Sequence, residues 1–159
     1  YGKAIRQGEL VQGGGGSSKV NEPKRSVVML TCNTTDNTAT NMKVNDLTDE
    51  FINIEANSIV GFEIYLTRLE IGGSSGTAGD FSYRHIKGVI RMDSSLVATI
   101  TTFNSRILGK DGTNGSASVI DTGTNTGILT IQVTGANNVN NIWNAVVYLH
   151  ETKTNIDIS

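Results

Sequence analysis

Apolar residues recur at every second position through most of the sequence, and this period constrains the fold more than any other feature. The clearest series lies within residues 59–71 and comprises Val60, Phe62, Ile64 and Leu66. Side chains of a β-strand point alternately to opposite faces, whereas a helix would repeat about every 3.6 residues. The sequence therefore predicts a half-buried strand over 59–71.

The same series changes parity at Arg68, because Leu69 and Ile71 continue it one position later. One extra residue in a strand would produce such a change. We therefore expect a β-bulge at Arg68, or a strand that passes from one sheet to another at this point.

Further strands are predicted along the rest of the chain. Residues 86–92 and 129–133 each have one apolar and one polar face. Residues 27–30 and 142–149 are apolar on both parities, which predicts burial on both faces, by the core and by a neighbouring subunit. Weaker strands are expected at about 39–44, 51–56, 96–108 and 117–121.

Turn-forming pairs such as Asp111-Gly112 and Asn114-Gly115 separate these strands. No amphipathic helix of more than two turns is evident, and no internal repeat. Eight or nine short strands at this spacing predict an all-β fold, an antiparallel β-sandwich of jelly-roll type in a single domain.

The first 25 residues differ from the rest of the chain. A run of glycines at 13–16 is followed by two serines, and the single proline, Pro23, precedes the first strong strand. Gly/Ser-rich segments behave as flexible linkers. We expect residues 1–25 to connect a β-sandwich module of residues 26–159 to a longer protein, of which a chain that starts at Tyr1 is a fragment.

Charge and cysteine content exclude several classes of function. The formal net charge is −2 and the basic residues are scattered, so we expect no nucleic-acid partner. Cys32 is the single cysteine; it follows an apolar run and is expected to be a buried thiol that forms no intrachain disulfide. The sequence has no signal-peptide pattern and no apolar run near the roughly 20 residues of a membrane span, so no membrane partner is expected.

No catalytic motif is recognisable, and we predict no catalytic residue, cofactor or metal. His85 and His150, with one cysteine, cannot form a typical zinc site without carboxylates. The loop 111–121 offers oxygen ligands for calcium but lacks the spacing of an EF-hand. A cluster of carboxylates falls in a predicted turn, where acidic residues also serve as caps: Asp46, Asp49 and Glu50.

The candidate ligand-binding residues are Tyr65, Tyr83, Arg84, His85 and Tyr148. The parity of the three tyrosines on their strands could leave their rings exposed. Exposed rings beside arginine or histidine are typical of a sugar-binding surface. The alternative is that these rings pack within the core or at a subunit interface.

Residues 121–152 read DTGTNTGILTIQVTGANNVNNIWNAVVYLHET and resemble a C-terminal module of bacteriophage tail fibres, tailspikes and other virion proteins. That module has a Thr-rich stretch, then Gly-x-Leu-x-Val-x-Val-Thr-Gly-Ala, an irregular loop, Trp-Val-Ala-Thr-Val and an acidic close. The matching positions are Gly127, Leu129, Ile131, Val133, Thr134, Gly135, Ala136, Trp143, Ala145, Val147 and Glu151.

The resemblance extends upstream in the same order. Residues 25–30 and 34–40 resemble the first strand of the module and its Thr-Thr-Asp-x-Thr turn, and residues 86–91 resemble its middle strand. The chain departs from the module at Ile142, where the family commonly has arginine, and in a tail over 153–159. The motifs are made of packing residues, so they imply a fold and a context more than a ligand.

The resemblance implies a non-enzymatic module on the tail or capsid surface of a virion. We expect a terminal, receptor-binding domain of a tail fibre or tailspike, a homotrimer that contacts other virion proteins and attaches to host surface polysaccharide. Two alternatives remain open. One is a structural capsid or tail decoration domain that contacts only virion proteins, and the other is a carbohydrate-binding accessory domain of a depolymerase.

Overall fold

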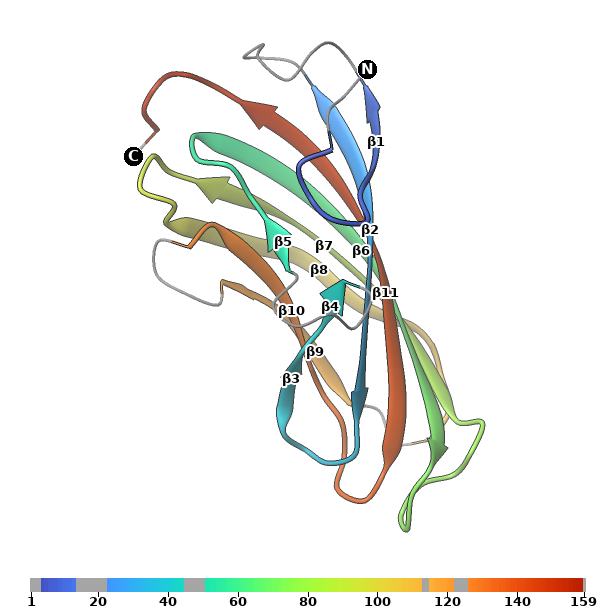
Figure 1. Cartoon of the computed structure of the whole chain (residues 1–159). Coiled ribbons are helices and arrows are strands. Elements are labelled where there is room, and N and C mark those ends of the chain that lie inside the picture. Colours follow the sequence, from blue (N-terminus) through green and yellow to red (C-terminus); the bar gives the residue numbers. More distant parts are fainter. Residues whose placement is uncertain (1–3, 14–22, 45–50, 113–114, 122–125, 159) are drawn as a thin grey trace.

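Two β-sheets pack face to face in this molecule (Figure 1). The computed structural model describes residues 4–13, 23–44, 51–112, 115–121 and 126–158. Every regular element in these ranges is a strand. The strands are β1 (Leu10–Gly13), β2 (Lys24–Thr34), β3 (Ala39–Asn41), β4 (Lys43–Val44), β5 (Ile52–Asn53), β6 (Ser58–Gly72), β7 (Phe81–Met92), β8 (Ala98–Lys110), β9 (Ser116–Asp121), β10 (Ile128–Thr134) and β11 (Asn140–Lys153).

The larger sheet, here called sheet A, has the strand order β1-β2-β11-β6-β7-β8, with β4 also paired to β2. The smaller sheet, sheet B, has the order β3-β10-β5, with β9 paired to β10. The pairs are antiparallel throughout the described residues. This confirms the predicted all-β antiparallel sandwich. More strands are present than the eight or nine expected, partly because residues 39–44 divide between the two sheets.

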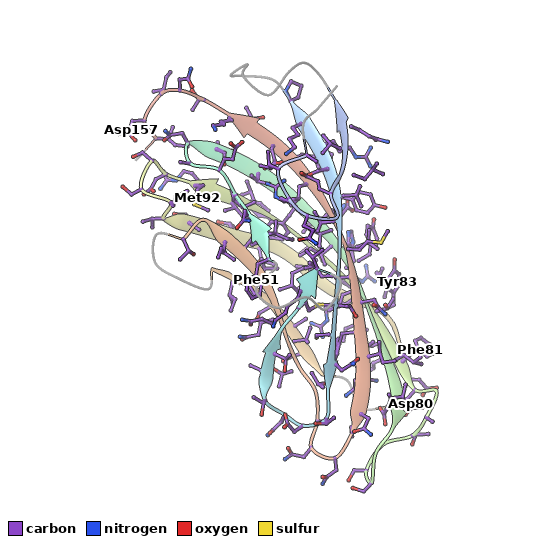
Figure 2. All side chains as sticks on the ribbon, viewed as in Figure 1. Phe51, Asp80, Phe81, Tyr83, Met92 and Asp157 are labelled. Carbon is purple, nitrogen blue, oxygen red and sulfur yellow. The ribbon has the colours of Figure 1, made fainter. Side chains whose placement is uncertain are left out.

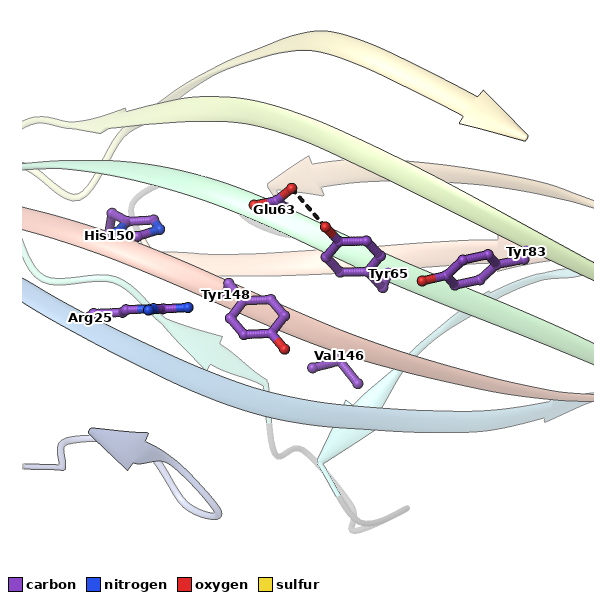
Figure 3. A pocket seen from close by; sticks show the side chains of 7 residues that line it. All are labelled: Arg25, Glu63, Tyr65, Tyr83, Val146, Tyr148 and His150. Atoms are coloured by element: carbon purple, nitrogen blue, oxygen red, sulfur yellow. Dashed lines mark hydrogen bonds between the residues drawn. The ribbon is translucent and has the colours of Figure 1, made fainter. Parts of the chain in front are cut away.

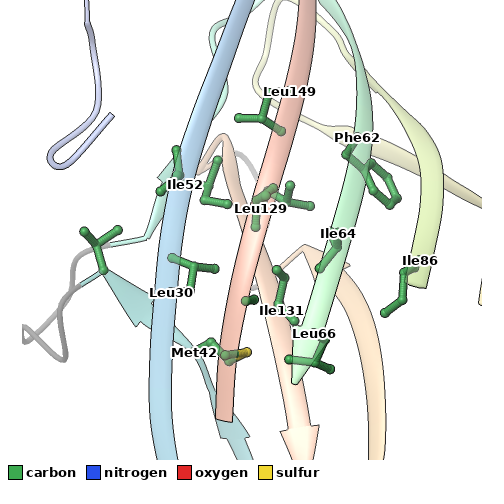
Figure 4. Close-up of a cluster of buried hydrophobic side chains, with 14 of the residues drawn as sticks. Leu30, Met42, Ile52, Phe62, Ile64, Leu66, Ile86, Leu129, Ile131 and Leu149 are labelled. Atoms are coloured by element: carbon green, nitrogen blue, oxygen red, sulfur yellow. The ribbon is translucent and has the colours of Figure 1, made fainter. Parts of the chain in front are cut away.

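The core lies between sheet A and sheet B (Figure 4). The apolar series of β6 is buried there, as its alternation predicted. Cys32 of β2 is buried too, as predicted. One cluster joins these side chains to those of sheet B, and its members include Leu30, Met42, Ile52, Phe62, Ile64, Leu66, Ile86, Leu129, Ile131 and Leu149. Removal of this apolar surface from water is the main stabilising contribution to the fold.

The predicted bulge or sheet change at Arg68 is wrong. β6 pairs with β7 without interruption from Ser58 to Leu69. Arg68 and Glu70 take the inward positions and are 2% and 3% exposed, whereas Leu69 is 46% exposed on the opposite face. The hydrophobic parity therefore changes because a buried ion pair, Arg68 and Glu70, takes the inward positions and Leu69 points outward. The register against β11 shifts only at the end of β6, next to Asn141.

The face of sheet A that points away from sheet B is here called the outer face. Figure 2 shows Phe81 and Tyr83 of β7 projecting on this side. Residues 27–30 and 142–149 are buried by the core on one face, as predicted, whereas on the other face Met29 is 63% exposed and the outward side chains of β11 are half-buried or exposed. A neighbouring subunit that covers this face stays a prediction.

β8 forms an edge of sheet A and has two register shifts against β7. The residues omitted from the pairing are Phe103 and Leu108. Phe103 is 70% exposed and Leu108 is also exposed. A bulge turns a side chain out of the regular ladder and discourages an open edge from pairing with another strand. Phe103 and Leu108 therefore stand at the two bulges of an edge strand whose residues 101–108 are all exposed.

The described N-terminal residues fall within the predicted connector, and they contact sheet A through β1 and a buried ionic cluster. The Arg6 guanidinium donates to the Glu151 carboxylate at 2.9 and 2.5 Å, and to Glu9 at 2.6 Å. The Lys24 Nζ lies 3.2 Å from Glu9 and 3.4 Å from Glu151. Residues 14–22, which contain most of the predicted Gly/Ser linker, lie outside the described residues.

Acid is expected to release this N-terminal segment from sheet A. Burial by itself would raise the pKa of Glu9, but the Ile5 N–H and the charges of Arg6 and Lys24 lower the pKa from 4.5 to about 2. A carboxylate whose pKa is lower in the folded state stabilises that state above its ordinary pKa, and the contribution is lost as pH falls from 4.5 to about 2.

Hydrogen exchange measures this release. We expect the protection factors of the β1 amides to fall as the pH is lowered across this range. In E9Q the β1 amides should already be about tenfold less protected than in the wild-type chain at pH 7. Full protection of β1 in the wild-type chain below the folded pKa of Glu9 would contradict the assignment.

Candidate functional site

A groove of about 480 Å³ lies on the outer face of sheet A (Figure 3). The strands that form it, β2, β11, β6 and β7, are neighbours in the sheet. The residues that line it alternate with buried residues along their strands, so the strand geometry directs their side chains outward. They are Arg25, Glu63, Tyr65, Tyr83, Val146, Tyr148 and His150.

Four rings from three strands meet at this groove. The ring of Tyr65 is stacked on that of His85, with centroids 4.5 Å apart and an interplanar angle of 12°. Tyr83 extends the stack, with its centroid 6.2 Å from that of Tyr65. Tyr148 meets Tyr65 edge to face at 5.9 Å. These are favourable aromatic geometries, so the rings support one another, and each of the four residues is half-buried on the outer face.

The antiparallel register explains why these rings meet. Tyr65 pairs directly with His85 of β7. Tyr83 and Tyr148 each lie one position diagonally from Tyr65, on the neighbouring strands β7 and β11. Diagonal neighbours on one sheet face are about 7–8 Å apart at the backbone, which is within reach of aromatic side chains. The ring cluster is therefore a consequence of strand order and register.

Glu63 is held by three side chains at the side of this cluster. One of its carboxylate oxygens lies 2.8 Å from the Lys87 Nζ, 2.7 Å from the His85 Nε2 and 3.0 Å from the Tyr65 hydroxyl, which donates to it. The hydrogen bond from Lys87 is the largest cause that lowers the pKa of Glu63 to about 2. The same carboxylate raises the pKa of Tyr65 and that of Lys87. Glu63 is therefore an ionised acceptor at neutral pH.

Four of the groove residues are not among the ligand-binding residues predicted from the sequence: Arg25, Glu63, Val146 and His150. Three of them share the parity of a candidate tyrosine on the same strand, and this signal could have identified them. Arg25 lies on β2, which has no candidate ring. Its guanidinium carbon stands 5.6 Å from the centroid of the Tyr148 ring, a cation–π contact that only the pairing of β2 with β11 creates.

Arg84 lies apart from the groove. It lies between Tyr83 and His85 on β7, so its side chain points to the face of sheet A opposite to the outer face. There it donates to the Ser105 Oγ at 3.5 Å and to the Gly115 carbonyl at 3.4 Å, and burial lowers its pKa. Arg84 thus connects β7 with β8 and the start of β9, while the other four candidate residues come together on the outer face.

The remaining predictions concern metals and loops. The part of the chain that the structure describes contains no group of three or more His, Cys, Asp or Glu side chains that could hold a metal ion. The acidic residues at 46, 49 and 50 lie outside it, as do residues 113 and 114 of the candidate calcium loop.

Gly112 has a φ of 65°, as the predicted Asp-Gly turn requires. The described residues include no helix of the length and hydropathy that a membrane span needs.

No family model and no curated protein matches this chain. Among solved structures, it is similar to the tailspike protein gp49 from Acinetobacter baumannii bacteriophage Fri1, a capsular polysaccharide depolymerase. The sequences are 12% identical and the TM-score is 0.39. The match covers 91% of this chain and 20% of the tailspike, so this chain spans about a fifth of that protein. A TM-score this low does not establish a common fold.

Proposed function

We propose that this chain is a terminal, receptor-binding module of a phage tail fibre or tailspike, and that its outer-face groove holds a glycan of the host surface. The resemblance of residues 121–152 to virion modules supports the context of a phage tail. The side chains of the groove support the ligand. In this function the module attaches the virion to a cell and leaves the glycan intact.

The ring cluster is the observation that carries the proposal. Sugar rings present C–H groups that pack on aromatic faces, and hydroxyl groups that need hydrogen-bond partners at the edges. Tyr65, Tyr83 and Tyr148 offer the faces, while Glu63 and Arg25 offer an acceptor and a donor beside them. The rings already contact one another, so little side-chain entropy would be lost on binding.

The carboxylate content of the groove supports binding rather than glycoside hydrolysis. Most glycosidases place two carboxyl groups roughly 5–9.5 Å apart across the scissile bond. Among the described residues that line the groove, Glu63 is the one carboxylate. Because its pKa is lowered to about 2, it is suited to accept hydrogen bonds and unsuited to donate a proton at neutral pH.

Binding of purified bacterial surface polysaccharides to the whole chain, measured on a glycan array and then by calorimetry, tests the proposal. We expect Y148A to weaken binding about tenfold through loss of ring packing, and Y65A to weaken it at least as much, because Tyr65 contacts every other ring. The matched control is F103A, which removes an exposed ring from the β8 edge. Equal binding by the two tyrosine variants, by F103A and by the wild-type chain would exclude the groove as the site.

A second candidate function is a structural domain that contacts only virion proteins. Several apolar side chains exposed on the same outer face favour it, since exposed apolar surface is typical of protein interfaces. They are Leu10, Met29, Ile59, Leu69 and Phe81. In that case no polysaccharide would bind, and deletion of the module would stop virion assembly.

Sedimentation of the 16.9 kDa chain tests the proposed homotrimer, which a monomer at micromolar concentration would rule out.

A further inference from the structure

The outer face of sheet A has a charge of the opposite sign to that of the whole chain. The chain has a formal net charge of −2. Strand alternation and register place several permanent cations on the outer face, but among the described strand residues only one carboxylate, Glu63. The cations are Arg25, Lys43, Lys87, Arg91 and Arg106. Such a local excess of positive charge attracts anionic ligands in particular.

The single carboxylate does not offset this excess across the face. Glu63 is already paired with Lys87 at 2.8 Å and lies 2.7 Å from the His85 Nε2. Its negative charge is therefore compensated locally by the side chains that hold it. An anionic ligand in the groove would therefore meet a neutralised Glu63 at the centre, with Arg25 and Arg106 at the sides.

Arg25 and Arg106 occupy the two sides of the ring cluster. Arg25 is on β2, beside Tyr148, and Arg106 is on β8, paired with His85. Both side chains are exposed, and no carboxylate of the described residues forms an ion pair with either. The strands between them are β11, β6 and β7. At about 4.8 Å per strand, β2 and β8 lie roughly 19 Å apart, a span for several sugar rings.

We infer that the ligand of the groove is an acidic polysaccharide, whose sugar rings pack on the tyrosines and whose carboxylates bind Arg25 and Arg106. This inference rests on the proposed function and specifies the class of glycan. The glycan runs across the strands of sheet A, from β2 to β8. Arginine suits this role because its planar guanidinium binds a carboxylate through two parallel hydrogen bonds.

A paired array tests the inference, with each bacterial surface polysaccharide printed both in native form and after reduction of its carboxylates to alcohols. We expect binding to carboxylate-bearing polysaccharides and a loss of at least about tenfold after reduction. R25Q and R106Q should each weaken binding of the native acidic form about tenfold. The matched control is K110Q, which removes an exposed cation from the same strand as Arg106 but at a position of inward parity.

The outcomes separate this inference from the proposed function. Equal binding to native and reduced polysaccharides, with Y65A still defective, would overturn the acidic class and retain the glycan site. Effects of K110Q as large as those of R106Q would also overturn it, because they would indicate general attraction in place of two specific contacts. No binding to any polysaccharide would overturn both.

Discussion

R68M is expected to lower the free energy of unfolding by about 3–5 kcal/mol, although it replaces a charged residue by an apolar one of similar length. The Arg68 guanidinium donates to Glu70 at 3.0 Å, to the Asn141 side chain at 2.9 Å and to the Asp111 carbonyl at 3.2 Å. Both charged residues are buried. Methionine would leave the Glu70 carboxylate without its cation, and an uncompensated buried charge is costly.

Urea unfolding followed by circular dichroism measures this effect, and two variants control it. R68M/E70L removes both charges and should recover part of the loss, although the Thr77 N–H then loses its acceptor, Glu70. K153M breaks the exposed ion pair with Glu55, and we expect it to cost less than about 1 kcal/mol. A loss in R68M as small as that in K153M would show that the pair contributes nothing to stability.

W143A is expected to destabilise the chain by about 3–5 kcal/mol, because it leaves a cavity in the core. Trp143 is among the largest fully buried side chains, and its Nε1 donates to the Thr34 Oγ1 at 2.9 Å. Its ring also packs close to Gly115, where an added methyl group would lie 2.9 Å from it. The side chain therefore joins β11, β2 and the start of β9.

Circular dichroism is required for this measurement, since Trp143 is the single tryptophan and its own fluorescence is lost in the variant. W143F keeps most of the apolar contact but removes the hydrogen bond, so we expect a smaller loss, about 1–3 kcal/mol. The neighbouring variant N144A changes an exposed outer-face side chain and should stay within about 0.5 kcal/mol of wild type. An equal effect of W143A and N144A would contradict the placement of Trp143 in the core.

Much of the candidate site was predictable because alternation along a strand is a local property. The parity of Tyr65, Tyr83, His85 and Tyr148 placed each side chain on one of two faces, and the core took the other. The same argument places Arg84 on the face away from its neighbours, where the structure has it. Parity alone would have separated Arg84 from the other four candidates.

The error at Arg68 shows where a hydrophobic pattern fails. Periodicity assigns apolar residues to the core and charged residues to solvent. Arg68 and Glu70 reverse this assignment, because the buried Arg68 guanidinium donates to the Glu70 carboxylate and to the side chain of Asn141 on β11. Asn141 is more than 70 positions away from Arg68 along the chain. A local sequence pattern therefore cannot predict that Asn141 accepts a hydrogen bond from the buried arginine. Leu69 then falls on the outer face because it lies between two buried residues.

The sequence by itself determined the class of fold, the approximate strands and the face of most side chains, because these follow from a period of two and from turn residues. Only the tertiary structure decided which strands are neighbours and in what register. Those choices place Arg25 beside Tyr148 and Arg106 beside His85. Pairing between distant strands depends on the packing of the whole core, so the groove and its charge are properties of the folded sheet.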